Sequence, residues 1–173
     1  IRQEVNGGSY ACRNRALFEA SGNFVTVHDS DDWSHPEKIR IQMENLPNQA
    51  EVFNYSFWVR ATDDMFFTGA TRSNDKFLLT NHSSALFTMD AVRNLGGWDS
   101  RSRITADVEF LWRFERAFGN TKGSTPNRKV MPGCPLSFGR YSLTSLTRTS
   151  TTHLTTIWHG VRREYREAAE WWQ

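Results

Sequence analysis

The sequence predicts an α/β fold, because segments of strand length alternate along the chain with segments of helical period. The chain has 173 residues, which suits one domain with a sizeable core. Seven Trp and twelve Phe, with 38% hydrophobic residues, indicate a folded chain and exclude a disordered one.

The first predicted helix covers residues 10–20, where alanines and a leucine recur at helical spacing. Gly22 follows as a plausible stop signal. Residues 23–28 then predict a short buried strand, which ends where the acidic stretch begins.

A second helix is expected to begin at Ser34, because Ser34 and Glu37 form a capping-box pattern. The helix is expected to run to about Leu46, since Pro47 follows. Its apolar face is expected to carry Ile39, Met43 and Leu46.

The middle of the chain predicts three further strands. Residues 51–60 and 65–70 are expected to pair across a turn at Asp63 and Asp64. Residues 84–88 form another apolar run of strand length.

Helices dominate the expected C-terminal half. Residues 89–95 predict a short helix, and residues 107–118 predict the clearest amphipathic helix of the chain. Residues 120–153 are rich in loop-forming residues, with one strand expected near 136–141. Residues 157–172 predict a terminal helix.

Net charge, hydropathy and cysteine spacing bear on whether the chain binds nucleic acid, crosses a membrane or holds zinc. A formal net charge of +2, with the basic residues scattered, does not predict nucleic-acid binding. No apolar run is long enough for a transmembrane helix. Cys12 and Cys134 lie in no zinc-like spacing, so we expect free, mostly buried thiols in a reducing compartment.

Three carboxylates follow the strand predicted at residues 23–28, namely Asp29, Asp31 and Asp32. Carboxylates at positions i and i+2 after a strand can face one hard cation such as Mg2+ or Mn2+. Such residues also form turns and cap helices, so the spacing by itself leaves both interpretations open.

Two blocks of sequence carry a more specific pattern. The first block begins at Gly8, includes Arg13-Asn14 and Asp29-Ser30-Asp31-Asp32, and extends past Lys38. The second block comprises Ala85–Phe87, Leu95-Gly96-Gly97-Trp98-Asp99 and Ala106–Arg113. In this order they resemble the family 2 glycosyltransferases with the GT-A fold. The resemblance covers residues 7–118 and is looser beyond them.

The resemblance implies a GT-A fold with a mixed sheet flanked by helices. The opening nucleotide-binding part of the family's domain has no counterpart here, so the fold is expected to be N-terminally incomplete. Residues 1–119 would form the metal, donor and acceptor-side part, and residues 120–173 a loop-rich extension with a terminal helix. Strand edges left exposed in such a fold favour a homo-oligomer.

The resemblance also implies transfer of a sugar, usually with inversion, from a nucleotide-diphosphate donor to a glycan, a lipid-linked molecule or another hydroxyl acceptor. Asp31, with Asp29, would hold Mn2+ or Mg2+ against the diphosphate. Asp29, Asp32 and Arg13 would bind the donor, although a structural salt bridge explains Arg13 equally well.

Asp107 occupies the position of the family's catalytic base, at the N-terminus of a predicted helix whose dipole favours a carboxylate. A simple helix N-terminal acid is the alternative. The family often has Glu before this Asp, whereas this chain has Ala106. Glu109 is the substitute base if Asp107 faces away.

Trp98 and His82 are candidate acceptor-binding residues. Trp98 could stack on a sugar ring, and core packing is an equal alternative. His82 could lie near the sugar, and a polar turn is its alternative.

The implied setting is polysaccharide assembly in the cytoplasm, with possible peripheral association with the inner face of the membrane. The competing interpretation is a non-catalytic module that keeps the scaffold and binds carbohydrate or protein. The absent opening part and Ala106 motivate it. A polymerising synthase is disfavoured, because the QxxRW pattern is absent.

Overall fold

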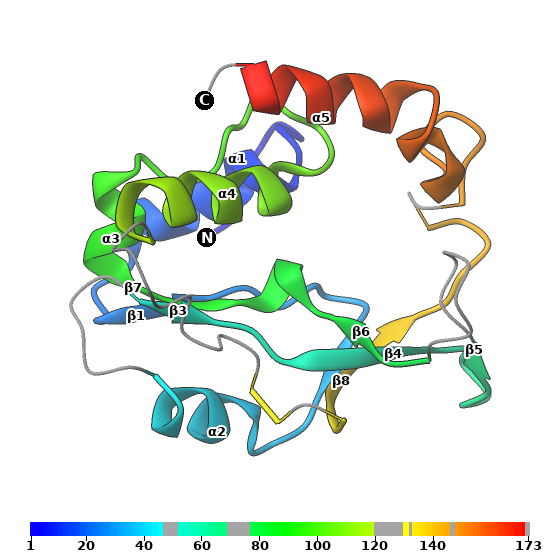
Figure 1. The fold of residues 1–173 in the computed structure, drawn as a ribbon, viewed down its shortest axis with the longest axis horizontal. Helices are drawn as coiled ribbons and strands as arrows, with labels where there is room; N and C mark the ends of the chain where they lie inside the picture. Colours follow the sequence, from blue (N-terminus) through cyan, green and yellow to red (C-terminus); the bar gives the residue numbers. More distant parts are fainter. Residues whose placement is uncertain (47–51, 69–76, 120–129, 132, 146–147, 172–173) are drawn as a thin grey trace.

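The computed structural model describes residues 1–46, 52–68, 77–119, 130–131, 133–145 and 148–171. Strands form the middle layer, with α1, α3 and α4 on one side, α2 on the other, and α5 beyond α4 (Figure 1). None of the described helices is long and apolar enough to span a membrane.

The first sheet has three strands in the order β1-β7-β3. These are β1 (Phe24–Thr26), β7 (Leu86–Thr88) and β3 (Phe53–Asn54), and both pairings are antiparallel. β1 is an edge strand within the described residues, and Phe24 is 37% exposed. The strand at 23–28 was therefore predicted correctly in type, but the expectation that it is buried is wrong.

The second sheet has the order β2-β8-β4-β5, with β6 also paired to β4. Its strands are β2 (Trp33–Ser34), β8 (Pro135–Arg140), β4 (Phe57–Ala61), β5 (Phe67–Thr68) and β6 (Leu79–Thr80). β4 and β8 run parallel, and the other pairings are antiparallel. The predicted mixed sheet is confirmed, and β8 brings the segment after residue 119 into the sheet built from the segment before it.

The helices agree with the predicted ranges, except for α2 and for the start of α5, which was predicted at residue 157 and lies at Val161. They are α1 (Ser9–Glu19), α2 (Lys38–Glu44), α3 (Met89–Asn94), α4 (Ala106–Phe118) and α5 (Val161–Trp171), with short 3-10 turns η1 (His82–Ser84) and η2 (Leu154–Ile157).

The predicted start and apolar face of α2 are both wrong. Ser34 belongs to β2, and the Nδ1 atom of His35 accepts the backbone N–H of Glu37 at 3.1 Å in place of a capping box. Ile39 is 46% exposed, whereas Gln42 is buried. The reason is a polar contact between α2 and β3: Nε2 of Gln42 donates to Oδ1 of Asn54 at 3.2 Å, and Nδ2 of Asn54 donates to the backbone carbonyl of Gln42 at 2.7 Å.

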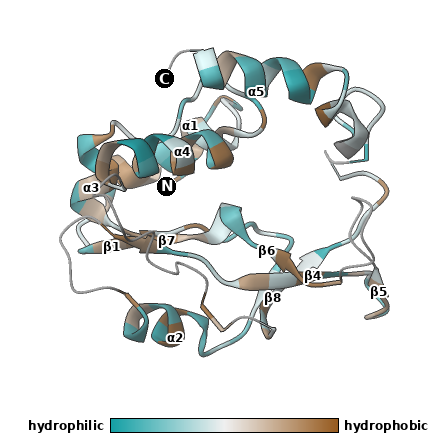
Figure 2. Ribbon diagram, in the orientation of Figure 1, coloured by the Kyte–Doolittle hydropathy of each residue, from teal (hydrophilic) through white to brown (hydrophobic). Residues whose placement is uncertain are grey.

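Aromatic side chains fill the core between the first sheet and α4. Phe53 lies 5.3 Å from Phe87 and 5.0 Å from Phe114 between ring centroids. Phe87 also contacts Phe110 at 5.2 Å. Hydrophobic segments of β1 and β7 lie side by side in the middle layer, whereas α5 is largely hydrophilic (Figure 2).

The cysteines are only partly as predicted. Cys12 and Cys134 are both free, but both are exposed. The expected burial is wrong because Cys12 lies on the outer side of α1, while Cys134 lies in the segment that leads into β8.

Candidate active site

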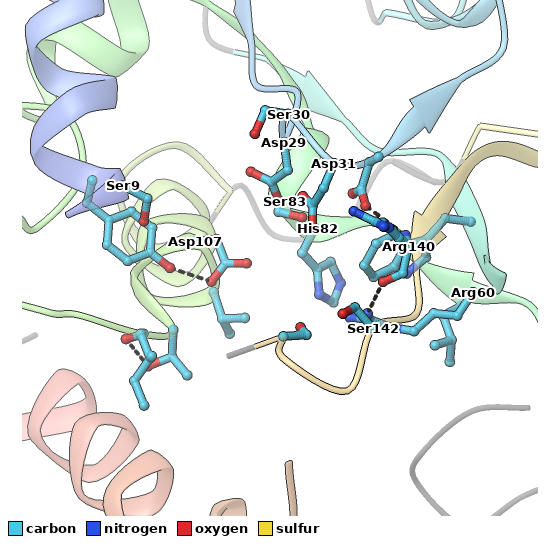
Figure 3. Close-up of a pocket in the computed structure, with 18 of the residues that line it drawn as sticks. Ser9, Asp29, Ser30, Asp31, Arg60, His82, Ser83, Asp107, Arg140 and Ser142 are labelled. Carbon is cyan, nitrogen blue, oxygen red and sulfur yellow. Dashed lines mark hydrogen bonds between the residues drawn. The ribbon is translucent and has the colours of Figure 1, made fainter. Parts of the chain in front are cut away.

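A cavity of about 810 Å³ opens between the acidic loop, the N-terminal ends of α1 and α4, and the second sheet. Four carboxylates line it. Three come from the acidic loop after β1, and Asp107 comes from the first turn of α4, apart from that loop (Figure 3). The structure thus brings together residues that are about 75 positions apart in the sequence.

The acidic loop is a tight turn, since the backbone N–H of Asp32 donates to the carbonyl of Asp29 at 3.1 Å. Nη2 of Arg13 donates to Oδ1 of Asp29 at 2.9 Å, which ties the loop to α1. Oδ1 of Asp32 accepts the backbone N–H of Arg140 at 3.0 Å, which ties the loop to β8. Asp31 is exposed and lines the cavity between these two attachments.

Burial shifts the pKa values of two charged groups at this loop, Asp32 and Lys38. Burial raises the pKa of Asp32 to about 6, and the charges of Asp29 and Asp31 add to the rise. Lys38, at the start of α2, is buried, and burial lowers its pKa to about 8 although Asp32 and Asp29 oppose the change. The loop is therefore crowded with negative charge, which favours a cationic ligand.

The fit of a divalent cation rests on the donor set. No group of three or more His, Cys, Asp or Glu side chains converges within the described part of the chain. Asp31 offers an exposed carboxylate, which is the hard ligand that Mg2+ and Mn2+ prefer. The residues thus fit an ion that completes its shell with donor phosphates and water, and they do not form a cage of protein ligands.

Asp107 is half-buried at the N-terminus of α4, where the helix dipole favours a negative charge. The hydroxyl of Tyr10, on α1, donates to its Oδ1 atom at 3.3 Å. Burial and the charge of Asp107 raise the pKa of Tyr10, so this hydroxyl stays protonated as a donor. The remaining carboxylate oxygen of Asp107 lies toward the cavity (Figure 3).

Two of the predicted site residues lie outside the cavity lining. Glu109 is 7% exposed and pairs with Arg113 at 2.8 Å, one turn further along α4. Trp98 is 5% exposed and packs on Phe110 at 5.2 Å between ring centroids. For Trp98, the structure supports the core-packing alternative.

His82 and Arg13 do line the cavity. His82 begins η1, and its ring packs edge-to-face on Tyr55 at 5.2 Å. Arg13 lies over the ring of Tyr10 at 5.1 Å, so its guanidinium contacts both Tyr10 and Asp29.

Sequence reasoning missed several lining residues. Tyr10 precedes Arg13 by three positions, and this helical spacing was the signal that could have placed both on one face. Apart from Arg13, the arginines of the lining were overlooked because they are scattered along the sequence and only the fold gathers them. They are Arg60, Arg103, Arg140 and Arg162.

Comparisons with known proteins decide the family. A family model described as glycosyl transferase family 2 matches residues 1–104, which is more than half of the chain. The chain belongs to glycosyltransferase family 2. The family match includes the acidic loop, whereas Asp107 and Glu109 lie beyond its end.

Curated relatives of this family 2 chain are similar to it over part of their length. Two uncharacterized glycosyltransferases, from Mycobacterium tuberculosis strains CDC 1551 and H37Rv, are each 28% identical to it over 122 residues. The alignment covers 65% of this chain and 46% of each relative. The chain thus spans about half the length of the curated relatives it matches.

Proposed function

We propose that this chain carries the catalytic site of an inverting, metal-dependent glycosyltransferase. The reaction moves a sugar from a nucleotide-diphosphate donor to a hydroxyl of a glycan or lipid-linked acceptor. The observation that carries the proposal is the placement of Asp29, Asp31 and Asp107 around one cavity. Family membership and this arrangement together support the reaction class.

On the donor side, Asp31 with Asp29 would hold Mn2+ or Mg2+, which when bound neutralises charge on the leaving diphosphate. Arg13 keeps Asp29 in place through the ion pair at 2.9 Å. Asp29 and Asp32 would contact the sugar or ribose of the donor, and their position on the cavity lining beside Asp31 supports this role.

On the acceptor side, Asp107 acts as the general base. Asp107 takes the proton of the acceptor hydroxyl, whose oxygen forms a bond to the anomeric carbon of the donor sugar. The bond from that carbon to the diphosphate oxygen breaks at the same time, and the electron pair leaves with the diphosphate. Attack from the side opposite the leaving group inverts the anomeric carbon.

The cell setting that we propose is polysaccharide assembly in the cytoplasm, with peripheral contact to the inner face of the membrane. A homo-oligomer is proposed because β1 is an unpaired edge within the described strands.

A screen of nucleotide sugars tests the proposal against the non-catalytic alternative. The chain is incubated with Mn2+ and UDP- or GDP-sugars, and release of UDP or GDP is measured. We expect release with at least one donor, reduced about 100-fold or more in Asp107→Asn. Asp90→Asn, in the first turn of α3, is the matched control and should keep the rate.

Absence of nucleotide release with every donor, together with binding of a glycan in both variants, would support the carbohydrate-binding module instead. Equal rates in the wild-type chain and Asp107→Asn would remove Asp107 from the mechanism.

A further inference from the structure

One wall of the cavity carries positive charge that the acidic loop does not pair. Arg60 lies on β4 and Arg103 on the segment before α4, and both line the cavity. Neither takes part in an ion pair among the described residues. Arg13 and Arg140, by contrast, pair with Asp29 and Asp63.

Arg60 is held in place by its neighbours on the sheet. Its guanidinium lies 4.7 Å from the centroid of the Trp58 ring and donates to the carbonyl of Arg140 at 3.3 Å. The indole ring of Trp58 packs closely against Gly139 on β8, where a Cβ would collide with the ring. The stack of Gly139, Trp58 and Arg60 therefore presents a fixed guanidinium to the cavity.

The half-buried position of Arg60 has an electrostatic cost. Burial lowers the pKa of Arg60, and the nearby Arg148 adds to the change, whereas the charges of Asp32, Asp31 and Asp29 oppose it. A guanidinium that is partly removed from water is stabilised most by a bound anion, which its planar fork can bind in a bidentate way.

The position of Arg60 in the cavity favours a contact with the acceptor over a contact with the donor. The proposed donor site lies at Asp29 and Asp31, while Arg60 lies beyond Arg140 and Ser142 on the sheet side (Figure 3). Asp107, the proposed base, lines the same cavity as Arg60. Resting on the proposed function, we infer that the acceptor carries an anionic group, a phosphate or a carboxylate, that binds Arg60.

Calorimetric titration tests this inference with three small probes, each added with saturating UDP and Mn2+ and again without them. Glucose 1-phosphate tests a phosphate, glucuronate tests a carboxylate, and glucose is the neutral control. We expect at least one anionic probe to bind more tightly than glucose when UDP is present. Arg60→Gln should weaken that binding roughly tenfold or more, which is the loss of one charge-assisted contact.

Two further variants serve as controls for Arg60→Gln. Arg60→Lys retains the charge and should keep more of the affinity than Arg60→Gln. Arg116→Gln removes an exposed arginine in the last turn of α4, outside the cavity lining, and should change nothing. Thermal melts check that each variant is folded.

Three results would overturn the inference. Anionic probes could bind no better than glucose, Arg60→Gln could bind as the wild-type chain does, or UDP could displace the probes, which would assign Arg60 to the donor phosphates. A chain that fails to bind UDP but binds an anionic probe through Arg60 would contradict the proposed function and leave the anion site standing.

Discussion

The hydroxyl of Tyr10 donates to the Oδ1 atom of Asp107 at 3.3 Å, and this bond joins α1 to the first turn of α4. Arg13, one turn further along α1, pairs with Asp29 on the acidic loop. α1 therefore contacts both Asp107 and, through Asp29, the acidic loop, so it sets the space between the proposed base and the proposed donor loop.

Removing the Tyr10 hydroxyl should lower kcat more than it lowers the affinity for the donor nucleotide. In Tyr10→Phe, Asp107 loses a donor that orients its carboxylate, so we expect kcat to fall roughly tenfold. The affinity for UDP with Mn2+ should stay within about twofold. Steady-state kinetics and calorimetry measure the two quantities, and a loss of UDP affinity with unchanged kcat would contradict the positioning role.

Removing the Arg13 charge should weaken donor binding. Arg13→Gln frees Asp29 from its 2.9 Å ion pair, so the acidic loop loses its attachment to α1. We expect the Kd for UDP with Mn2+ to rise roughly tenfold. Arg15→Gln breaks an exposed pair with Glu19 on the same helix and is the matched control. Equal affinities in the two variants would argue that Arg13 is merely structural.

A methyl group at Gly97 should destabilise the fold. Gly97 has a φ of 75°, and a Cβ there would lie 2.5 Å from Oδ1 of Asn14, the atom that accepts the N–H of Trp98. We expect Gly97→Ala to lower the free energy of unfolding by about 2 to 4 kcal/mol.

Gly96→Ala is the control for Gly97, because Gly96 has the same φ of 75° and open space around it. It should cost only about 1 to 2 kcal/mol for the left-handed backbone. Urea denaturation measures both variants. Equal losses would mean that the Asn14–Trp98 contact adds nothing to stability.

Replacing Lys38 should stabilise the protein at neutral pH. Its folded pKa of about 8 lies below its ordinary value, so the buried charge costs stability below pH 8, and that cost disappears as the pH rises from 8 past 10.5. We expect Lys38→Met to raise the free energy of unfolding at pH 7 by about 1 to 3 kcal/mol.

The gain from Lys38→Met should shrink as the pH rises above 8, because the unfolded chain still binds the proton there while the folded chain has lost it. Lys38→Arg keeps the charge and should show no gain. Thermal melts between pH 7 and pH 10 provide the comparison, and a gain that does not depend on pH would point to packing alone.

Local pattern predicted most of the elements because α1 and α4 carry apolar residues at helical spacing, and α4 ends at Gly119 as expected. α2 was misjudged because Gln42 is buried by its bond to Asn54, a partner 12 residues away that no local pattern shows. β2 and β6 were missed because each has two residues and exists only through pairing with β8 or β4.

The site could be predicted in part, from the resemblance to family 2 glycosyltransferases. Spacing by itself left Asp29, Asp31 and Asp107 open to structural interpretations, and all three line one cavity in the structure. Tyr10 and Arg60 could not be assigned, because their roles depend on contacts with Asp107 and Trp58 that form only after folding. Trp98 was ambiguous for a related reason, since a tryptophan suits a sugar site and a core equally well.

The most direct test of the account is a calorimetric titration of the chain with UDP, with and without Mn2+, in the wild type and in Asp31→Asn. Asp64→Asn, an exposed acid in the turn between β4 and β5, is the matched control. We expect Mn2+-dependent binding of UDP in the wild type and in Asp64→Asn, and its loss in Asp31→Asn. Binding of UDP that is unchanged in Asp31→Asn, or indifferent to Mn2+, would contradict the proposal that the acidic loop binds the donor diphosphate through a metal ion.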